Sequence, residues 1–294
     1  MPTTLVRARK GALVLAVSLT AIVTASSAAA VTSISSSGYG LGVDLTVLGF
    51  LPVTLGPIAS ASGASPPGPY NATNSVLTLN STLGVGSILD GLSVNTGVLT
   101  GSASSPWTPT PTGTGTGTVN GLTSLTLSSL LGSELGISAT TISSTSSVSG
   151  SGSLEAFGST TIEDLVISGS AVGSTITVGG TVAVNPPVDD VIFDAGGLEI
   201  ELNRQVLTGA NGPTSTADGI TTDALYIDFN SFLLGTNLVS GDITVGESEA
   251  AITGPPTTGV IPEPGTWGLF LAGFAGLGAA LRVRRRAAST SAAT

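Results

Sequence analysis

Hydrophobic and polar residues alternate over most of the chain between residues 31 and 252, and this period of two is typical of β-strands. Segments such as Thr175–Val178 and Thr181–Val184 are rich in β-branched residues, which favour strands over helices. The pattern predicts an all-β body with antiparallel, β-sandwich-like sheets, and the Ser/Thr/Val pattern of residues 138–184 leaves a β-solenoid as an alternative. We expect strands at residues 39–49, 76–80, 94–102, 116–127, 138–149, 153–157, 160–168, 174–184, 197–203, 222–229 and 241–245.

Interruptions of this pattern mark the expected turns and loops. Prolines and a glycine at residues 66–69 break the alternation, because proline cannot donate a hydrogen bond to a neighbouring strand. The Thr/Pro/Gly-rich segment Thr108–Thr118 is predicted to be a long flexible loop or a wide hairpin tip, and residues 253–261 a linker. The Leu-rich pieces Val85–Leu89 and Leu130–Leu135 are expected to form short helical turns.

The charged residues are distributed unevenly. The chain of 294 residues has 18 acidic and 8 basic side chains and a net charge of −10. Three bases lie in the first ten residues and four in the last thirteen, so residues 31–265 combine all 18 acids with Arg204 alone, a charge of −17. Nucleic acids and anionic lipids are bound by clustered Lys and Arg. We therefore expect no nucleic-acid partner.

Few side chains are available for chemistry. The sequence has no His and no Cys, and its only lysine and methionine are Lys10 and Met1. Thiol nucleophiles, Ser/His/Asp triads, Schiff bases and His/Cys zinc sites are therefore excluded from residues 31–252. We expect no catalytic residue and no cofactor.

Carboxylates are the remaining candidates. Asp189, Asp190 and Asp194 follow two prolines, and Glu199 and Glu201 come soon after. Such oxygens suit calcium, although the spacing does not match an EF-hand loop. A solvated acidic strand edge, which discourages aggregation, is the other interpretation, and we assign no metal site. The two glutamates are predicted to share one face of a strand because they are two residues apart.

The body is interpreted as non-enzymatic. A glycosidase needs only two carboxylates, but its sugar groove is normally lined by aromatic rings, and only 4% of this chain is aromatic. Trp107 lies in the Pro/Thr-rich segment, where it can equally well anchor a loop by packing. Arg204 is expected to pair with a neighbouring acid such as Glu201 or Glu199.

The N-terminus has the three parts of a secretory signal. Basic residues within the first ten positions precede the apolar residues 12–25, and small residues at Ala28 and Ala30 stand before Val31. The apolar stretch is shorter than the roughly 20 residues of a membrane-spanning helix, so an uncleaved anchor is the lesser alternative. We expect residues 1–30 to be a helical signal peptide that signal peptidase removes before Val31.

Three features follow one another at the C-terminus. They are the motif Pro262, Glu263, Pro264; the apolar stretch Trp267 to Leu281; and the basic cluster Arg282, Arg284, Arg285, Arg286. In this order they resemble the PEP-CTERM sorting signal of exported bacterial proteins. By that resemblance, an exosortase, a transpeptidase-like enzyme of the inner membrane, cuts the chain at or near the motif, and the protein is released or re-attached at the cell surface.

The physical properties of this segment agree with transient membrane retention. A helix of the 15 residues from Trp267 to Leu281 is about 23 Å long, which is shorter than a hydrocarbon core of roughly 30 Å. The two prolines of the motif keep the preceding chain extended. The Arg cluster holds residues 287–294 on the cytoplasmic side. Residues 262–286 are thus expected to contain a C-terminal transmembrane helix.

The body also resembles the choice-of-anchor proteins, particularly those of the P type, which join a secreted ectodomain to different surface anchors. No activity follows from this resemblance. It rests on the segments Gly38–Leu45, Val53–Pro57, Thr96–Thr100, Thr160–Leu165 and Ile220–Leu225.

These observations lead to one functional hypothesis. The chain is expected to be a membrane-anchored precursor at the inner membrane and then a non-enzymatic protein of the cell surface or extracellular matrix, associated with exopolysaccharide. After both cleavages, 17 acids and Arg204 remain, a charge of −16. The alternative is a secreted carbohydrate-binding or carboxylate-dependent carbohydrate-cleaving β-sandwich that uses the same anchor.

Overall fold

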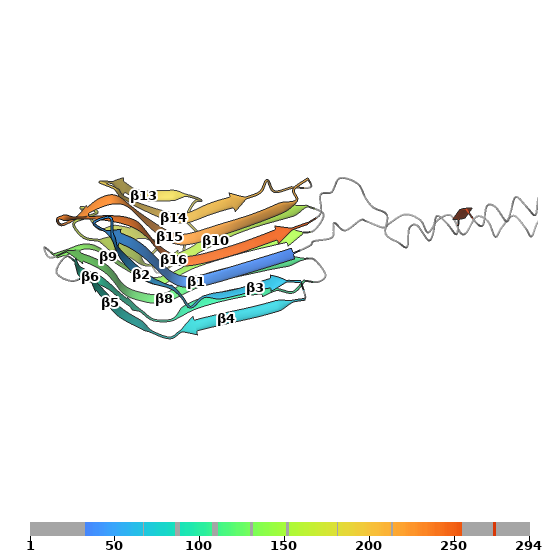
Figure 1. The fold of residues 1–294 in the computed structure, drawn as a ribbon, viewed down its shortest axis with the longest axis horizontal. Coiled ribbons are helices and arrows are strands. Elements are labelled where there is room, and N and C mark those ends of the chain that lie inside the picture. Colours follow the sequence, from blue (N-terminus) through green and yellow to red (C-terminus); the bar gives the residue numbers. More distant parts are fainter. Residues whose placement is uncertain are drawn as a thin grey trace, which may run out of the picture. The chain divides into compact units, whose positions relative to one another are not determined.

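The body is built from antiparallel β-strands. The computed structural model describes residues 33–66, 68–85, 89–107, 111–129, 132–150, 153–180, 182–212, 214–254 and 273–274. These residues contain sixteen strands, arranged in two sheets in which every pairing is antiparallel (Figure 1). All strands belong to one compact unit, Ala29–Thr257.

The first sheet has seven strands and contains the two ends of the described body. Its order is β13 (Asp190–Ala195), β14 (Leu198–Thr208), β15 (Ala217–Leu234), β16 (Asn237–Thr253), β1 (Ser33–Val47) and β2 (Leu51–Ile58), with β3 (Ala61–Ser65) also paired to β1. Ser33 at the start of β1 pairs with Thr253 at the end of β16, so both chain connections leave the body at one end. We call the half of the body that contains this end the proximal half, and the other the distal half.

The second sheet has nine strands because its two longest strands each pair with different neighbours in the two halves. Its order is β12 (Ile176–Val178), β11 (Leu165–Ser168), β9 (Gly132–Gly150), β8 (Thr112–Ser129), β6 (Leu89–Thr96) and β5 (Leu79–Val85). In the proximal half, β10 (Leu154–Glu163) pairs with β9, and β7 (Leu99–Ser105) joins β8 to β4 (Tyr70–Val76). The alternating pattern of the sequence is therefore realised in long strands that cross the whole body.

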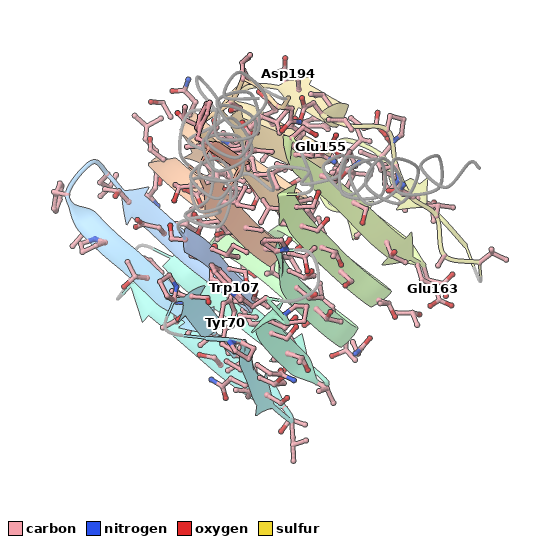
Figure 2. The ribbon with its side chains drawn as sticks, turned by 90° about the vertical axis from the view of Figure 1, so that its right-hand side faces the viewer. Tyr70, Trp107, Glu155, Glu163 and Asp194 are labelled. Carbon is pink, nitrogen blue, oxygen red and sulfur yellow. The ribbon has the colours of Figure 1, made fainter. Side chains whose placement is uncertain are left out.

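The two sheets pack face to face, and Figure 2 shows them as two layers viewed along the strands. Large aliphatic side chains such as Leu125, Ile137, Ile200 and Ile227 fill the distal half. A smaller apolar cluster, which includes Ile34, closes the proximal end, with Trp107 packed against it. The all-β, antiparallel prediction is confirmed, and the solenoid alternative is wrong, because adjacent strands run in opposite directions instead of as successive parallel coils.

Between these two clusters the sheets approach too closely for ordinary side chains. In β8, residues 112–118 alternate between half-buried threonines and buried glycines, and we call this segment the Thr/Gly repeat. A Cβ atom on Gly115 would overlap the carbonyl oxygens of Ser37 and Glu249 in the first sheet, and Gly117 lies equally close to the backbone of Tyr39. The described part of the predicted loop Thr108–Thr118 is therefore mostly strand, and its glycines are required by close packing.

Three smaller expectations also need correction. Residues 132–135 are extended in β9, and Val85 and Leu89 are strand residues, so the described parts of the two predicted helical turns are not helical. The predicted strand 76–80 spans the turn between β4 and β5. Among the described residues of the predicted strand 174–184, only β12 and an isolated bridge at Val184 form, because Gly179 and Gly180 adopt positive φ angles.

Candidate functional site

The predicted processing sites lie outside the described residues. These are Ala28, Ala30 and Val31, the motif Pro262–Pro264, and the basic cluster Arg282–Arg286. Of the stretch Trp267–Leu281, only Gly273 and Phe274 are described, and both have helical backbone. Among the described residues, no helix has the length and apolar character needed to cross a membrane.

Acidic side chains gather on the outer face of the first sheet. Asp194 pairs with Glu199, Glu199 with Asp228, Asp228 with Asp242, and Asp242 with Asp44, so five carboxylates stand in one row across five strands. We call this row the acidic ladder. Adjacent strands lie roughly 4.7–4.9 Å apart, and like charges directly opposite one another destabilise a sheet. The ladder is therefore a costly arrangement that protons or cations would relieve.

A second row on the same face combines charges of both signs. It consists of Arg204, Asp223, Glu247 and Tyr39, which are register partners on β14, β15, β16 and β1, and we call it the polar row. Arg204 Nη1 donates to Asp223 Oδ2 at 3.0 Å, and the Tyr39 hydroxyl donates to Glu247 Oε2. Arg204 also lies 3.9 Å from the centre of the Tyr226 ring, a cation–π contact.

Burial shifts the pKa of both carboxyl groups of the polar row upward. Asp223 is only 2% exposed, and its buried Oδ1 atom has no hydrogen-bond partner. Burial raises the pKa of Glu247 to about 7, and the Asp223 and Glu249 carboxylates add to this effect, while the Tyr39 hydroxyl opposes it. Hydrogen bonding of the protonated Glu247 carboxyl with Asp223 is the smallest of the causes that raise this pKa. Burial likewise raises the pKa of Asp223, although Arg204 opposes the shift.

Backbone irregularity beside this row sets the direction of its side chains. Asn203 adopts a φ of 53°, a conformation that asparagine tolerates better than most residues, and is buried to 1% exposure. Its side-chain amide donates to the Pro186 carbonyl at 2.9 Å and accepts from the Thr160 hydroxyl at 3.0 Å. Because Asn203 is fixed in this way, Arg204 reaches across the outer face toward β15.

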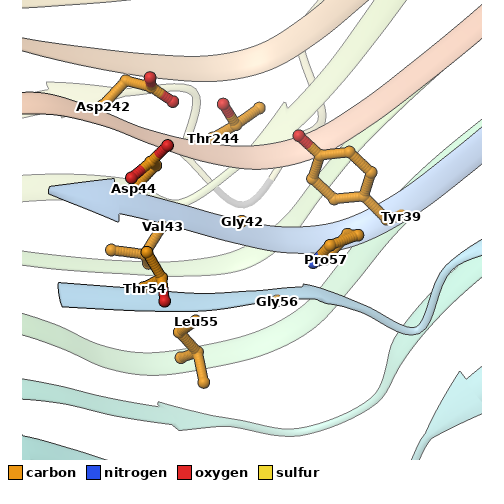
Figure 3. Close-up of a pocket in the computed structure, with 10 residues that line it drawn as sticks. All are labelled: Tyr39, Gly42, Val43, Asp44, Thr54, Leu55, Gly56, Pro57, Asp242 and Thr244. Carbon is orange, nitrogen blue, oxygen red and sulfur yellow. The ribbon is translucent and has the colours of Figure 1, made fainter. Parts of the chain in front are cut away.

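A shallow pocket lies on the same face between β1, β2 and β16. Figure 3 shows Asp44 and Asp242 side by side on neighbouring strands, with Thr244 and Tyr39 further along them. The pocket has a volume of about 270 Å³, and Leu55, Gly56 and Pro57 of β2 line its opposite side. Burial, together with the neighbouring ladder carboxylates Asp44 and Asp228, raises the pKa of Asp242.

The carboxylates singled out in the sequence do not form a metal centre. Asp189 accepts from the Gln205 backbone N–H at 2.8 Å, so it joins the segment before β13 to β14, whereas Asp190 and Asp194 lie on the edge strand β13. Within the described residues, no group of three or more acidic side chains is close enough to hold a metal ion. Asp190 and Asp194 lie on an edge strand, as the interpretation of an acidic strand edge predicts, and Asp194 is also the first residue of the acidic ladder.

The predictions for Arg204 and the glutamates are partly right. Glu199 and Glu201 flank the buried Ile200 and share the outer face. Arg204 contacts Glu201 at 3.8 Å, as expected, but its shorter contact is with Asp223. Burial, with Asp189, raises the pKa of Glu201, and Arg204 opposes this shift.

Two carboxyl groups lie next to each other in the polar row. Glu247 and Asp223 are register partners on adjacent strands, and Arg204 holds Asp223 in an ion pair. Burial raises the pKa of Glu247 to about 7. The chemistry that the row supports is proton binding.

The comparison with known proteins identifies the C-terminal segment. A family model described as the PEP-CTERM protein-sorting motif matches residues 260–286. No curated protein and no solved structure matches the chain. The resemblance of the body to the choice-of-anchor P proteins therefore has no support from these comparisons. A motif of this kind marks a protein that an exosortase sorts to the cell surface.

Proposed function

We propose that the chain is a surface or extracellular-matrix protein that is exported with a cleaved signal peptide and then released from the membrane by an exosortase. The observation that carries this proposal is the match of residues 260–286 to the PEP-CTERM sorting motif. Pro262, Glu263 and Pro264 serve recognition, Trp267–Leu281 retains the precursor in the membrane, and the Arg cluster orients it.

The fold of the body suits delivery from a membrane-held precursor. The first and last strands of the body begin and end at its proximal end, where Ser33 pairs with Thr253, so the chain enters and leaves the described body at the same end. A body with a charge of −16 stays soluble and repels anionic polymers unless divalent cations bridge them. We assign it a binding or structural role next to exopolysaccharide, like that of an ectodomain joined to an exchangeable anchor.

The sorting step is tested by changing the motif in the full chain. The triple variant P262A/E263A/P264A should accumulate in the membrane fraction at the mass of the precursor without its signal peptide. The wild-type protein should be recovered outside the inner membrane at a mass that shows both cleavages. Intact-mass spectrometry of each fraction measures both forms.

A matched control separates recognition from a general effect of losing prolines. Pro255 and Pro256 lie a few residues upstream, outside the matched segment. The variant P255A/P256A should be processed like wild type. Normal release of the triple variant would refute the proposal, as would a C-terminus of the released protein far from residues 262–264.

A further inference from the structure

The outer face of the second sheet carries a regular array of hydroxyl groups in its proximal half. Strands β4, β7, β8, β9 and β10 are adjacent there, and their outward positions are occupied mainly by Ser and Thr. We call these side chains the hydroxyl array. Its members are Thr73, Ser75, Thr100, Ser102, Ser104, Thr112, Thr114, Thr116, Thr118, Ser143, Thr145, Ser147, Ser149, Ser159 and Thr161.

The array is ordered in two directions because its members are register partners. One complete row runs Thr73, Ser102, Thr116, Thr145, Ser159, with one hydroxyl on each of the five strands. The rows on either side have the same spacing. Hydroxyls therefore repeat at roughly 4.7–4.9 Å across the strands and roughly 6.7 Å along them.

The chemistry of this face contrasts with that of the first sheet. Carboxylates only accept hydrogen bonds, so the acidic ladder requires cations or donors, whereas each hydroxyl both donates and accepts. The array members carry no charge, and Figure 2 shows the acids Glu155 and Glu163 toward opposite ends of the bordering strand β10. An uncharged partner with many hydroxyl groups matches this face in both charge and hydrogen bonding.

An aromatic ring borders the array. Phe157 on β10 is the register partner of Ser147 and is 57% exposed, although large apolar side chains are usually turned inward. An exposed ring beside a row of hydroxyls offers an apolar surface for the C–H groups of a sugar ring. The array and Phe157 together present the polar and apolar contacts that a sugar chain has.

From these observations we infer that the hydroxyl array with Phe157 is a docking surface for a neutral polysaccharide. This inference rests on the extracellular location given by the proposed function and assigns the partner a face and a chemical class. Each contact is weak, so binding comes from many repeated contacts along a polymer. Because no charge takes part, binding should not depend on salt or on divalent cations.

The test uses the full chain purified in mild detergent and sedimented with insoluble neutral glucans of β-1,4, β-1,3 and α-1,3 linkage. At least one glucan should retain the wild-type protein in 0.5 M NaCl with EDTA. The double variant T116V/T145V removes two central hydroxyls without changing side-chain shape and should weaken retention about tenfold or more. F157A should also weaken it.

The control variant T221V removes a threonine hydroxyl from the outer face of the first sheet and should bind like wild type. Circular dichroism and thermal melting establish that each variant folds. Retention by none of the glucans would overturn the inference, as would retention that EDTA abolishes, or equal binding by all variants. Sorting does not affect this assay, so its failure would leave the proposed function intact.

Discussion

Replacing Glu247 by glutamine measures the energetic effect of the proton in the polar row. The folded protein raises the pKa of Glu247 from 4.5 to about 7, mainly because the carboxyl is buried beside Asp223. Between these two pH values the folded state binds more protons than the unfolded state, so stability falls as pH rises. The contribution is fully present below pH 4.5 and is lost as pH rises through 7, and the shift corresponds to about 3 kcal/mol.

The glutamine variant should behave like the protonated wild type at every pH. Its amide N–H groups can donate to Asp223 Oδ1, and its amide oxygen can accept from the Tyr39 hydroxyl. The wild-type melting temperature should fall by roughly 6–12 °C between pH 4.5 and pH 8 on account of this group, because 1 kcal/mol shifts a domain of this size by about 2–4 °C. E247Q should lose little melting temperature over this pH range and should be more stable than wild type at pH 8.

The assay is thermal melting followed by far-UV circular dichroism from pH 4.5 to pH 8 at constant ionic strength. A smaller slope should remain in E247Q, because the folded state also raises the pKa of Asp242 and Glu201. The control variant E163Q changes a glutamate on β10 in the second sheet and should keep the full wild-type slope. Equal slopes in wild type and E247Q would refute the raised pKa of Glu247.

Three further changes test the packing and the charges of the body. G115A should lose about 3 kcal/mol of stability in urea unfolding, because the added Cβ overlaps backbone atoms of the opposite sheet. The control G136A, whose Cβ would lie 3.6 Å from the nearest atom, should change the stability by less than about 0.5 kcal/mol. Equal losses in the two variants would contradict the close approach of the sheets. D228N removes the central carboxylate of the acidic ladder and should add about 0.5 kcal/mol at pH 7 in low salt and nothing in 1 M NaCl; a loss of stability in low salt would count against repulsion. R204M should lower the free energy of unfolding by about 2 kcal/mol in the same assay. This loss is smaller than that from breaking a fully buried ion pair, because the Arg204 side chain is 34% exposed. An unchanged free energy of unfolding would show that Asp223 does not need the ion pair.

The strand content of the body could be predicted from its alternating pattern, but the role of the Thr/Gly repeat could not. Thr and Gly alternate there, and both residue types are common in loops, so local composition favoured a flexible segment. The decisive fact is non-local, because Gly115 faces carbonyl oxygens of residues far away in the sequence. The period of two, with Gly at every buried position, was the signal that could have identified a strand.

The candidate site was predicted only in part, for a similar reason. The sequence drew attention to Asp189, Asp190 and Asp194 because they cluster along the chain, yet these side chains do not converge. Asp223 and Glu247 are separated by 23 intervening residues, and only the register between β15 and β16 makes them neighbours. Asp223 and Glu247 each lie in a strand whose neighbouring residues are mostly buried, and this is the one local indication that the two carboxyl groups are withdrawn from water.

The Thr/Gly repeat links the two outer faces of the body. Its threonines lie on the central strand of the hydroxyl array, β8. Its glycine Gly117 packs against the backbone of Tyr39 on β1 and of Glu247 on β16, and these two residues form one end of the polar row. A side chain at Gly117 would push these strands outward and disturb the polar row from behind. Because the glycines allow this contact and the threonines face outward, one repeat supports an acidic, proton-binding face on one side and a neutral hydroxyl face on the other. A substitution such as T116V can therefore change the second face without touching the first, and this makes the two proposed roles experimentally separable.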